Sequence, residues 1–142
     1  MKAWSKIKEE FDADGSLRDI CVEDVDSGIW EVFIANMKSS EFRLEFTHGG
    51  ESVNIPNTFA EVKRLQEVDP TILHIWLNEE IHVNCHFFCE TEIELDVSPR
   101  EIQGDSEYKV LTDFLDWLAS RLGRKVVLTH ENSPDRVILS VG

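Results

Sequence analysis

Positive charge is scarce in this sequence. Only 14 of its 142 residues are Lys or Arg, against 28 Asp or Glu, which gives a formal net charge of −14 at pH 7. Because proteins bind nucleic acid largely through Lys and Arg that displace counterions from phosphates, this composition argues against a nucleic-acid-binding protein. A basic protein would suit the acidic surface as a partner. Acidity that only keeps the chain soluble is the simpler explanation, and we favour it.

Long hydrophobic runs are also missing. No segment approaches the roughly 18 consecutive apolar residues needed to span a bilayer, so no membrane association is expected. Residues 1–14 lack the apolar centre of a secretory signal, and the three Cys are an odd number without a paired framework. We therefore expect three free thiols and a cytoplasmic protein.

Catalytic motifs are absent as well. The chain has no G-x-S-x-G elbow and no glycine pattern that would cradle a phosphate. The segment around Asp12, Asp14 and Gly15 begins like a calcium loop, but with Gly15 at the sixth position the twelfth falls on Cys21, where a bidentate Glu is required. No calcium site is expected, and enzyme activity has no positive support.

The sequence does contain enough hydrophobic residues to form a core. Hydrophobic residues make up 42% of the chain and include four Trp and eight Phe. At this length we expect a single domain, residues 1–142, that buries about two thirds of the surface of its unfolded chain.

The stretch at residues 70–99 alternates apolar and polar residues almost without a break, which predicts three antiparallel strands in a meander. Its turns are expected at residues 78–80 and 89–91, because paired residues must have the same parity to keep one face apolar. The apolar face should contain Leu73, Ile75, Leu77, Ile81, Val83, Cys85, Phe87, Ile93, Leu95 and Val97.

The other face of the meander is the candidate binding face. The same register sets Trp76 opposite His82, Asn84 between His74 and Asp96, and His86 between Ile72 and Glu94. Three histidines, a tryptophan and two carboxylates then share one side of the sheet. The candidate site residues are His74, Trp76, His82, His86, Glu94 and Asp96.

Periodicity and capping residues predict the other elements. Helices are expected at residues 1–11, 28–38, 58–67 and 106–122, with Asp26 or Ser27, Thr58 and Ser106 as N-caps and Gly123 ending the last helix. Strands are expected at 17–25, 41–47 and 125–129, at 136–141 after a turn at 131–135, and in a brief extended piece at 53–55.

These elements predict an α+β fold. We expect a mostly antiparallel sheet of about six or seven strands with the three-stranded meander at its centre, covered by one long C-terminal helix and two or three shorter helices. Residues 17–47 could form a strand–helix–strand crossover with two parallel strands.

Two metal hypotheses follow from the histidines. On a helix, a set of two His and two Cys, namely His82, Cys85, His86 and Cys89, would line one face as zinc ligands. On a strand the His and Cys point to opposite sides, and the flanking Ile, Val and Phe favour a strand, so we predict no cofactor and keep zinc only as an alternative. A metal or acid–base site built from the His, Glu and Asp residues of the candidate binding face survives the strand interpretation. An ordinary polar sheet face is the simpler interpretation of these residues.

An acidic row, Glu90, Glu92 and Glu94, continues along the third strand of the meander to Asp96. It could attract a cationic partner. Charged strands also deter edge-to-edge pairing, and we favour that role on the sequence alone.

At LRDICVEDV, HVNCHFF, EIELDVSPREI and VVLTHEN the chain resembles members of an uncharacterised family of small bacterial α+β proteins. The resemblance covers most of the chain and implies no activity. In size, acidity and Trp content the chain also resembles immunity proteins that neutralise bacterial toxins. Two functional hypotheses remain: a non-catalytic, acidic interaction protein of the immunity or regulatory kind, and a metal- or His-dependent enzyme that uses the face of Trp76, His82 and His86.

Overall fold

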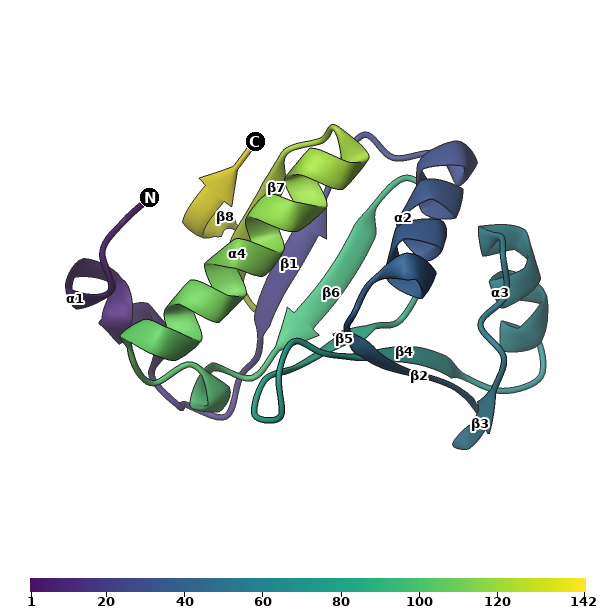
Figure 1. The fold of residues 1–142 in the computed structure, drawn as a ribbon, viewed down its shortest axis with the longest axis horizontal. Helices are drawn as coiled ribbons and strands as arrows, with labels where there is room; N and C mark the ends of the chain where they lie inside the picture. The colour runs from purple at the N-terminus through teal and green to yellow at the C-terminus, as the bar shows by residue number, and fades with distance from the viewer.

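The computed structural model describes all residues 1–142 and contains one eight-stranded sheet. Its strand order is β3-β2-β4-β5-β6-β1-β7-β8, and every neighbouring pair is antiparallel (Figure 1). The elements are α1 (Trp4–Ile7), the 3-10 helix η1 (Lys8–Phe11), β1 (Arg18–Val22), α2 (Ser27–Ser39), β2 (Arg43–His48), β3 (Glu51–Val53), α3 (Phe59–Gln66), β4 (Thr71–Trp76), β5 (His82–Cys85), β6 (Ile93–Val97), η2 (Pro99–Glu101), α4 (Asp105–Leu122), β7 (Val126–His130) and β8 (Ser133–Val141).

The α+β prediction is confirmed, with eight strands rather than six or seven. The short β3 adds an edge strand, because Gly49 and Gly50 both adopt positive φ and turn the chain back onto β2. The closing hairpin is also tighter than predicted, since β8 starts at Ser133, inside the expected turn.

The meander of β4, β5 and β6 is confirmed, and so is most of its register. Trp76 pairs with His82, and Asn84 pairs with both His74 and Asp96. β5 ends at Cys85, because Phe87 adopts a left-handed backbone conformation with φ of 60°. The predicted ladder pairs of His86 with Ile72 and Glu94 are therefore not formed.

β1 and β2 run in the same direction, as the crossover hypothesis required, but they are not neighbours. Three strands, β4, β5 and β6, lie between them, and β1 pairs with β6 and β7 instead. This long-range pairing matters for function, because it brings the polar residues of β1 against the end of the meander.

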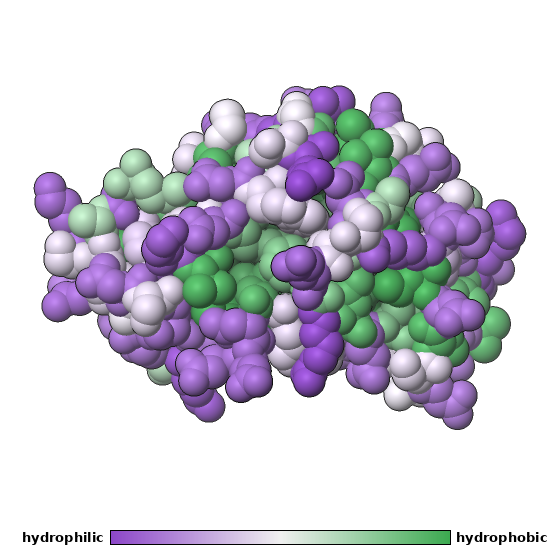
Figure 2. Space-filling model, viewed as in Figure 1, coloured by the Kyte–Doolittle hydropathy of each residue, from purple (hydrophilic) through white to green (hydrophobic).

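The helices α2, α3 and α4 lie on one face of the sheet (Figure 1). Their apolar sides form one core cluster with the odd-numbered residues of β4, β5 and β6 and with even-numbered residues of β1, β2 and β7, and Trp30, Ile75, Val83, Leu95 and Leu115 are fully buried. Figure 2 shows hydrophobic surface emerging between polar side chains on this helix-bearing face. None of the helices combines the length and the apolar character that a membrane span requires.

Most helix ends follow their predicted caps. The side chains of Asp26 and Thr58 accept hydrogen bonds from the first turns of α2 and α3, and Gly123 ends α4 with φ of 61°. Ser106 is not the cap of α4, because the helix already begins at Asp105 and the Ser106 hydroxyl donates to Glu107 instead. The first predicted helix is split into α1 and η1.

The opposite face of the sheet carries none of these three helices, and we call it the open face. Even-numbered residues of β4, β5 and β6 point to it and are half-buried, whereas their odd-numbered neighbours are buried almost without exception. The open face therefore presents the polar side chains of the meander to solvent.

Candidate functional site

A stack of planar side chains occupies one end of the open face. Arg43, Trp76 and His82 lie directly opposite one another on β2, β4 and β5. The Arg43 guanidinium carbon lies 4.0 Å from the centre of the Trp76 ring, and the Trp76 and His82 rings stack with centroids 4.7 Å apart and planes 8° apart. The indole is therefore enclosed between a guanidinium and an imidazole, which is a favourable cation–π arrangement. We call Arg43, Trp76, His82 and His74 the planar stack.

His74 and His82 are hydrogen-bonded to each other. His74 Nδ1 lies 3.0 Å from His82 Nε2, and His74 Nε2 lies 3.3 Å from the Thr47 hydroxyl. Burial and the neighbouring His74 lower the pKa of His82, which disfavours the charged form of this imidazole. Both nitrogens of His74 are thus engaged within the protein.

The third histidine, His86, pairs with a carboxylate. Its Nε2 donates to Asp96 Oδ2 over 3.0 Å, while Asn84 donates to Asp96 Oδ1 over 3.2 Å. The hydrogen bond to Asp96 raises the pKa of His86, with a smaller contribution from the charge of Glu94. Asp96 is therefore held by both of its oxygens.

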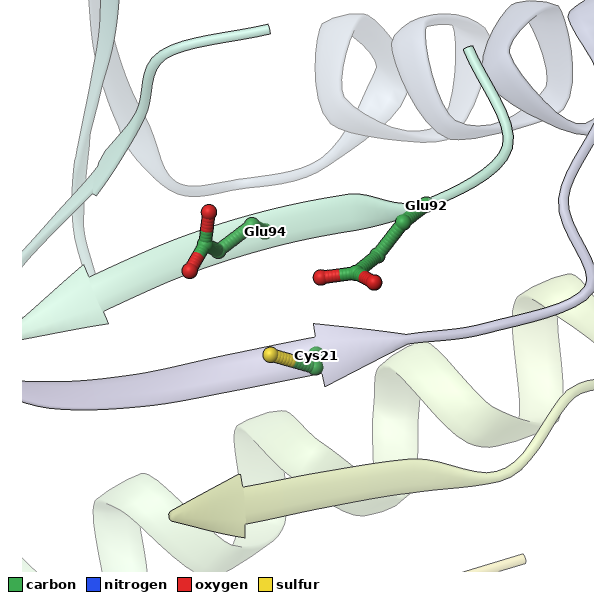
Figure 3. A group of neighbouring side chains, drawn as sticks. All are labelled: Cys21, Glu92 and Glu94. Carbon is green, nitrogen blue, oxygen red and sulfur yellow. The ribbon is translucent and has the colours of Figure 1, made fainter. Parts of the chain in front are cut away.

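The pairing of β6 with β1 concentrates carboxylates at the centre of the open face. Asp19 lies directly opposite Asp96, and Cys21 lies directly opposite Glu94. The possible ligand atoms of Cys21, Glu92 and Glu94 all lie within 4.8 Å of one another (Figure 3). We call Asp19, Glu92, Glu94 and Asp96 the carboxylate cluster, and Cys21 lies beside the first three of them.

No Lys or Arg of the protein forms an ion pair with the carboxylate cluster. The ion pairs of the structure are Arg18–Asp14, His86–Asp96, Lys109–Asp113 and His130–Glu10. Of the four cluster carboxylates, Asp96 alone has a partner of potentially opposite charge.

The pKa values of the cluster reflect this concentration of negative charge. Burial raises the pKa values of Asp19 and Glu94, and the neighbouring carboxylates raise them further. Burial together with Glu92 and Glu94 raises the pKa of the Cys21 thiol to about 12. The cluster is therefore a place where a cation would be stabilised.

All six residues of the predicted binding face lie on the open face, but they form two groups. His74, Trp76 and His82 belong to the planar stack, whereas His86, Asp96 and Glu94 belong to the region of the carboxylate cluster. In the predicted acidic row, Glu92 and Glu94 lie in the cluster, while Glu90 lies in the exposed turn before β6.

The four-ligand zinc set does not come together. His82 and His86 lie on the open face, whereas Cys85 is fully buried in the core and Cys89 is exposed in a turn. All three Cys are free thiols, as predicted. The one group of three converging metal-ligand side chains is Cys21, Glu92 and Glu94. Their proximity was not predicted from the sequence.

Sequence reasoning missed Asp19, Cys21 and Arg43. Asp19 and Cys21 alternate with the buried Ile20 and Val22 within a correctly predicted strand, so their placement on a polar face could be read from the sequence. The strand that pairs with β1 could not be predicted, because local alternation carries no information on long-range pairing.

Comparisons of the chain with protein-family models, with curated proteins and with solved structures found no match. The resemblance to a family of small bacterial proteins therefore stays a prediction.

Proposed function

We propose that this chain is a non-catalytic interaction module that binds a basic polypeptide on its open face. The carboxylate cluster is the subsite for the Lys or Arg side chains of the partner. The observation that carries this proposal is a group of four carboxylates on adjoining strands that no Lys or Arg of the chain neutralises. The immunity-like or regulatory proteins expected from the sequence belong to this functional class.

The cluster has an energetic cost in the unbound protein. Like charges directly opposite each other on neighbouring strands are destabilising, and Asp19 and Asp96 occupy such positions. A guanidinium placed among these carboxylates would turn repulsion into charge-assisted hydrogen bonds. A binding role thus accounts for residues that folding alone would disfavour.

The alternative, a metal- or His-dependent enzyme, has weaker support. Its histidines are engaged internally, His74 with His82 and His86 with Asp96. The planar stack also covers both faces of Trp76, so the indole offers no free face for a substrate ring.

A titration with hexa-arginine, followed by amide NMR, tests the proposal. We expect the largest shifts at Cys21, Glu92 and Glu94, and much weaker binding at 1 M than at 0.1 M salt, because the Debye length falls from about 10 Å to about 3 Å. Shifts spread evenly over the surface, or centred on α2 and α4, would refute the proposed subsite.

A further inference from the structure

A hollow of about 360 Å³ opens between the end of β5 and the segment that joins α3 to β4. Its hydrophobic lining residues are Val68, Ile72 and Phe88, and its polar and charged lining residues include Lys63, Asp69 and His86. Apart from Met1, Val68 and Phe88 are the most exposed large hydrophobic residues of the protein, at 76% and 62%. Single exposed apolar residues are ordinary, but two such highly exposed residues that flank one hollow indicate a contact surface.

The backbone conformation of Phe87 places Phe88 beside the hollow. A left-handed conformation is unfavourable for a bulky residue, and Phe87 adopts it while its ring is fully buried and stacked on Trp30, with centroids 5.1 Å apart. The turn leaves the next residue, Phe88, outside the core. There its ring stacks on His86 with centroids 5.0 Å apart and planes 16° apart.

Hydrogen bonds hold His86, the residue on which the exposed Phe88 ring stacks. Gln66 of α3 donates to the backbone oxygen of His86 over 3.0 Å and also contacts Thr71 over 2.9 Å. The His86 ring is fixed in turn by its hydrogen bond to Asp96. A surface that is ordered before binding loses little conformational entropy when a partner arrives.

His86 connects the hollow to the carboxylate cluster. His86 lines the hollow and is hydrogen-bonded to Asp96 of the cluster, and the charge of Glu94 contributes to raising its pKa. β5 and β1 are separated by two inter-strand spacings, about 10 Å in all, which an extended chain covers in about three residues.

The charges assign the two subsites. The charged and titratable residues of the hollow are Lys63, Asp69 and His86, so it has no excess of negative charge that would favour a basic side chain, whereas the carboxylate cluster has one. An apolar side chain fits the hollow, because Val68, Ile72 and Phe88 can cover it.

We propose that the hollow receives an apolar anchor residue of the basic polypeptide, located about three residues from a Lys or Arg that enters the carboxylate cluster. This inference rests on the proposed function and names the partner more narrowly. It describes a basic segment in which aromatic or large aliphatic residues are spaced from the charges, rather than a uniformly charged tail.

Two synthetic peptides test the inference in NMR titrations of the whole protein. They are acetyl-Arg-Arg-Gly-Gly-Phe-Gly-Gly-amide and its counterpart with Ser in place of Phe. We expect the Phe peptide to bind at least about fivefold more tightly, since part of a phenyl ring leaves water, and to shift the amides of Val68, Ile72 and Phe88. Phe88→Ala should remove this preference without unfolding the protein, because the side chain is exposed. Val137→Ala, which truncates an exposed apolar residue on β8, is the matched control and should keep the preference.

The outcomes separate the two proposals. If the two peptides bind equally, or the preference survives in Phe88→Ala, the hollow is not an anchor site while the cluster remains the basic subsite. If neither peptide shifts an amide of the open face, both proposals fail. If the amides of Val68 and Phe88 shift with protein concentration before peptide is added, the hollow is occupied by a second copy of the chain and the assignment is wrong.

Discussion

Asp19 and Asp96 lie directly opposite each other on β1 and β6, at the centre of the open face. The main chain of Asn132 donates to Asp19 over 2.9 Å, and His86 donates to Asp96, so the two carboxylates are held in place despite their mutual repulsion. This pair forms the middle of the cluster on which the proposed function rests.

Removing one cluster charge should stabilise the unbound protein. Because the pKa of Glu94 is raised above its ordinary value of 4.5 in the folded state, the folded protein binds that proton more tightly than the unfolded chain does. Stability therefore falls as pH rises through the raised pKa. We expect Glu94→Gln to gain a few tenths to about 1 kcal/mol at pH 7 and little at pH 4 in urea unfolding. A loss of stability at pH 7 would show that the carboxylate is favourable where it lies.

The histidines should titrate on opposite sides of their ordinary value of 6.5. Asp96 raises the pKa of His86, whereas burial lowers that of His82. The stabilisation from His86 is thus fully present below pH 6.5 and is lost as pH rises through the folded-state pKa. NMR titration of the imidazole protons measures both values. Asp96→Asn should move the His86 pKa down towards 6.5, and no movement would rule out Asp96 as the cause.

The two adjacent phenylalanines should differ sharply in their effect on stability. Phe87 is fully buried, so Phe87→Ala should cost about 3–5 kcal/mol in the free energy of unfolding. Phe88 is largely exposed, so Phe88→Ala should cost less than about 0.5 kcal/mol. Denaturant unfolding of both variants measures this difference. A cost for Phe88→Ala near that of Phe87→Ala would mean that Phe88 supports the fold rather than a partner.

Metal analysis of protein purified without a His tag separates the interaction module from the enzyme alternative. We expect no stoichiometric zinc, because no histidine of the open face converges with two other metal-ligand side chains. Zinc that is present and lost in His86→Ala would favour the enzyme. Zinc lost in Cys21→Ser would instead indicate a metal at the carboxylate cluster.

The meander could be predicted from sequence because its apolar residues alternate over almost thirty positions. A side-chain period of two fixes which residues share a face, and parity then fixed pairs such as Trp76 with His82. The predicted pairing of His86 was wrong, because nothing in the local sequence pattern indicates that Phe87 adopts a positive φ. Six residues of the open face could therefore be named in advance, but not how they are grouped.

The carboxylate cluster and the hollow could not be predicted, because both depend on contacts between distant segments. Cys21 meets Glu94 only because β1 pairs with β6 after the chain has passed through four other strands. Val68 meets Phe88 at the hollow from the turn that follows α3. Single-sequence periodicity reports faces of elements but not which elements become neighbours.

The central claim, that the carboxylate cluster is the basic subsite, is tested most directly by the dissociation constant of hexa-arginine for two charge-matched double variants at 0.1 M salt. Glu92→Gln with Glu94→Gln removes two charges from the cluster, whereas Glu31→Gln with Asp116→Asn removes two exposed charges from α2 and α4. We expect the cluster variant to bind at least about tenfold more weakly than the wild type, and the helix variant to lose less than about threefold through net charge alone. Equal losses in the two variants would contradict the proposed site, since only the overall acidity of the protein would then attract the peptide.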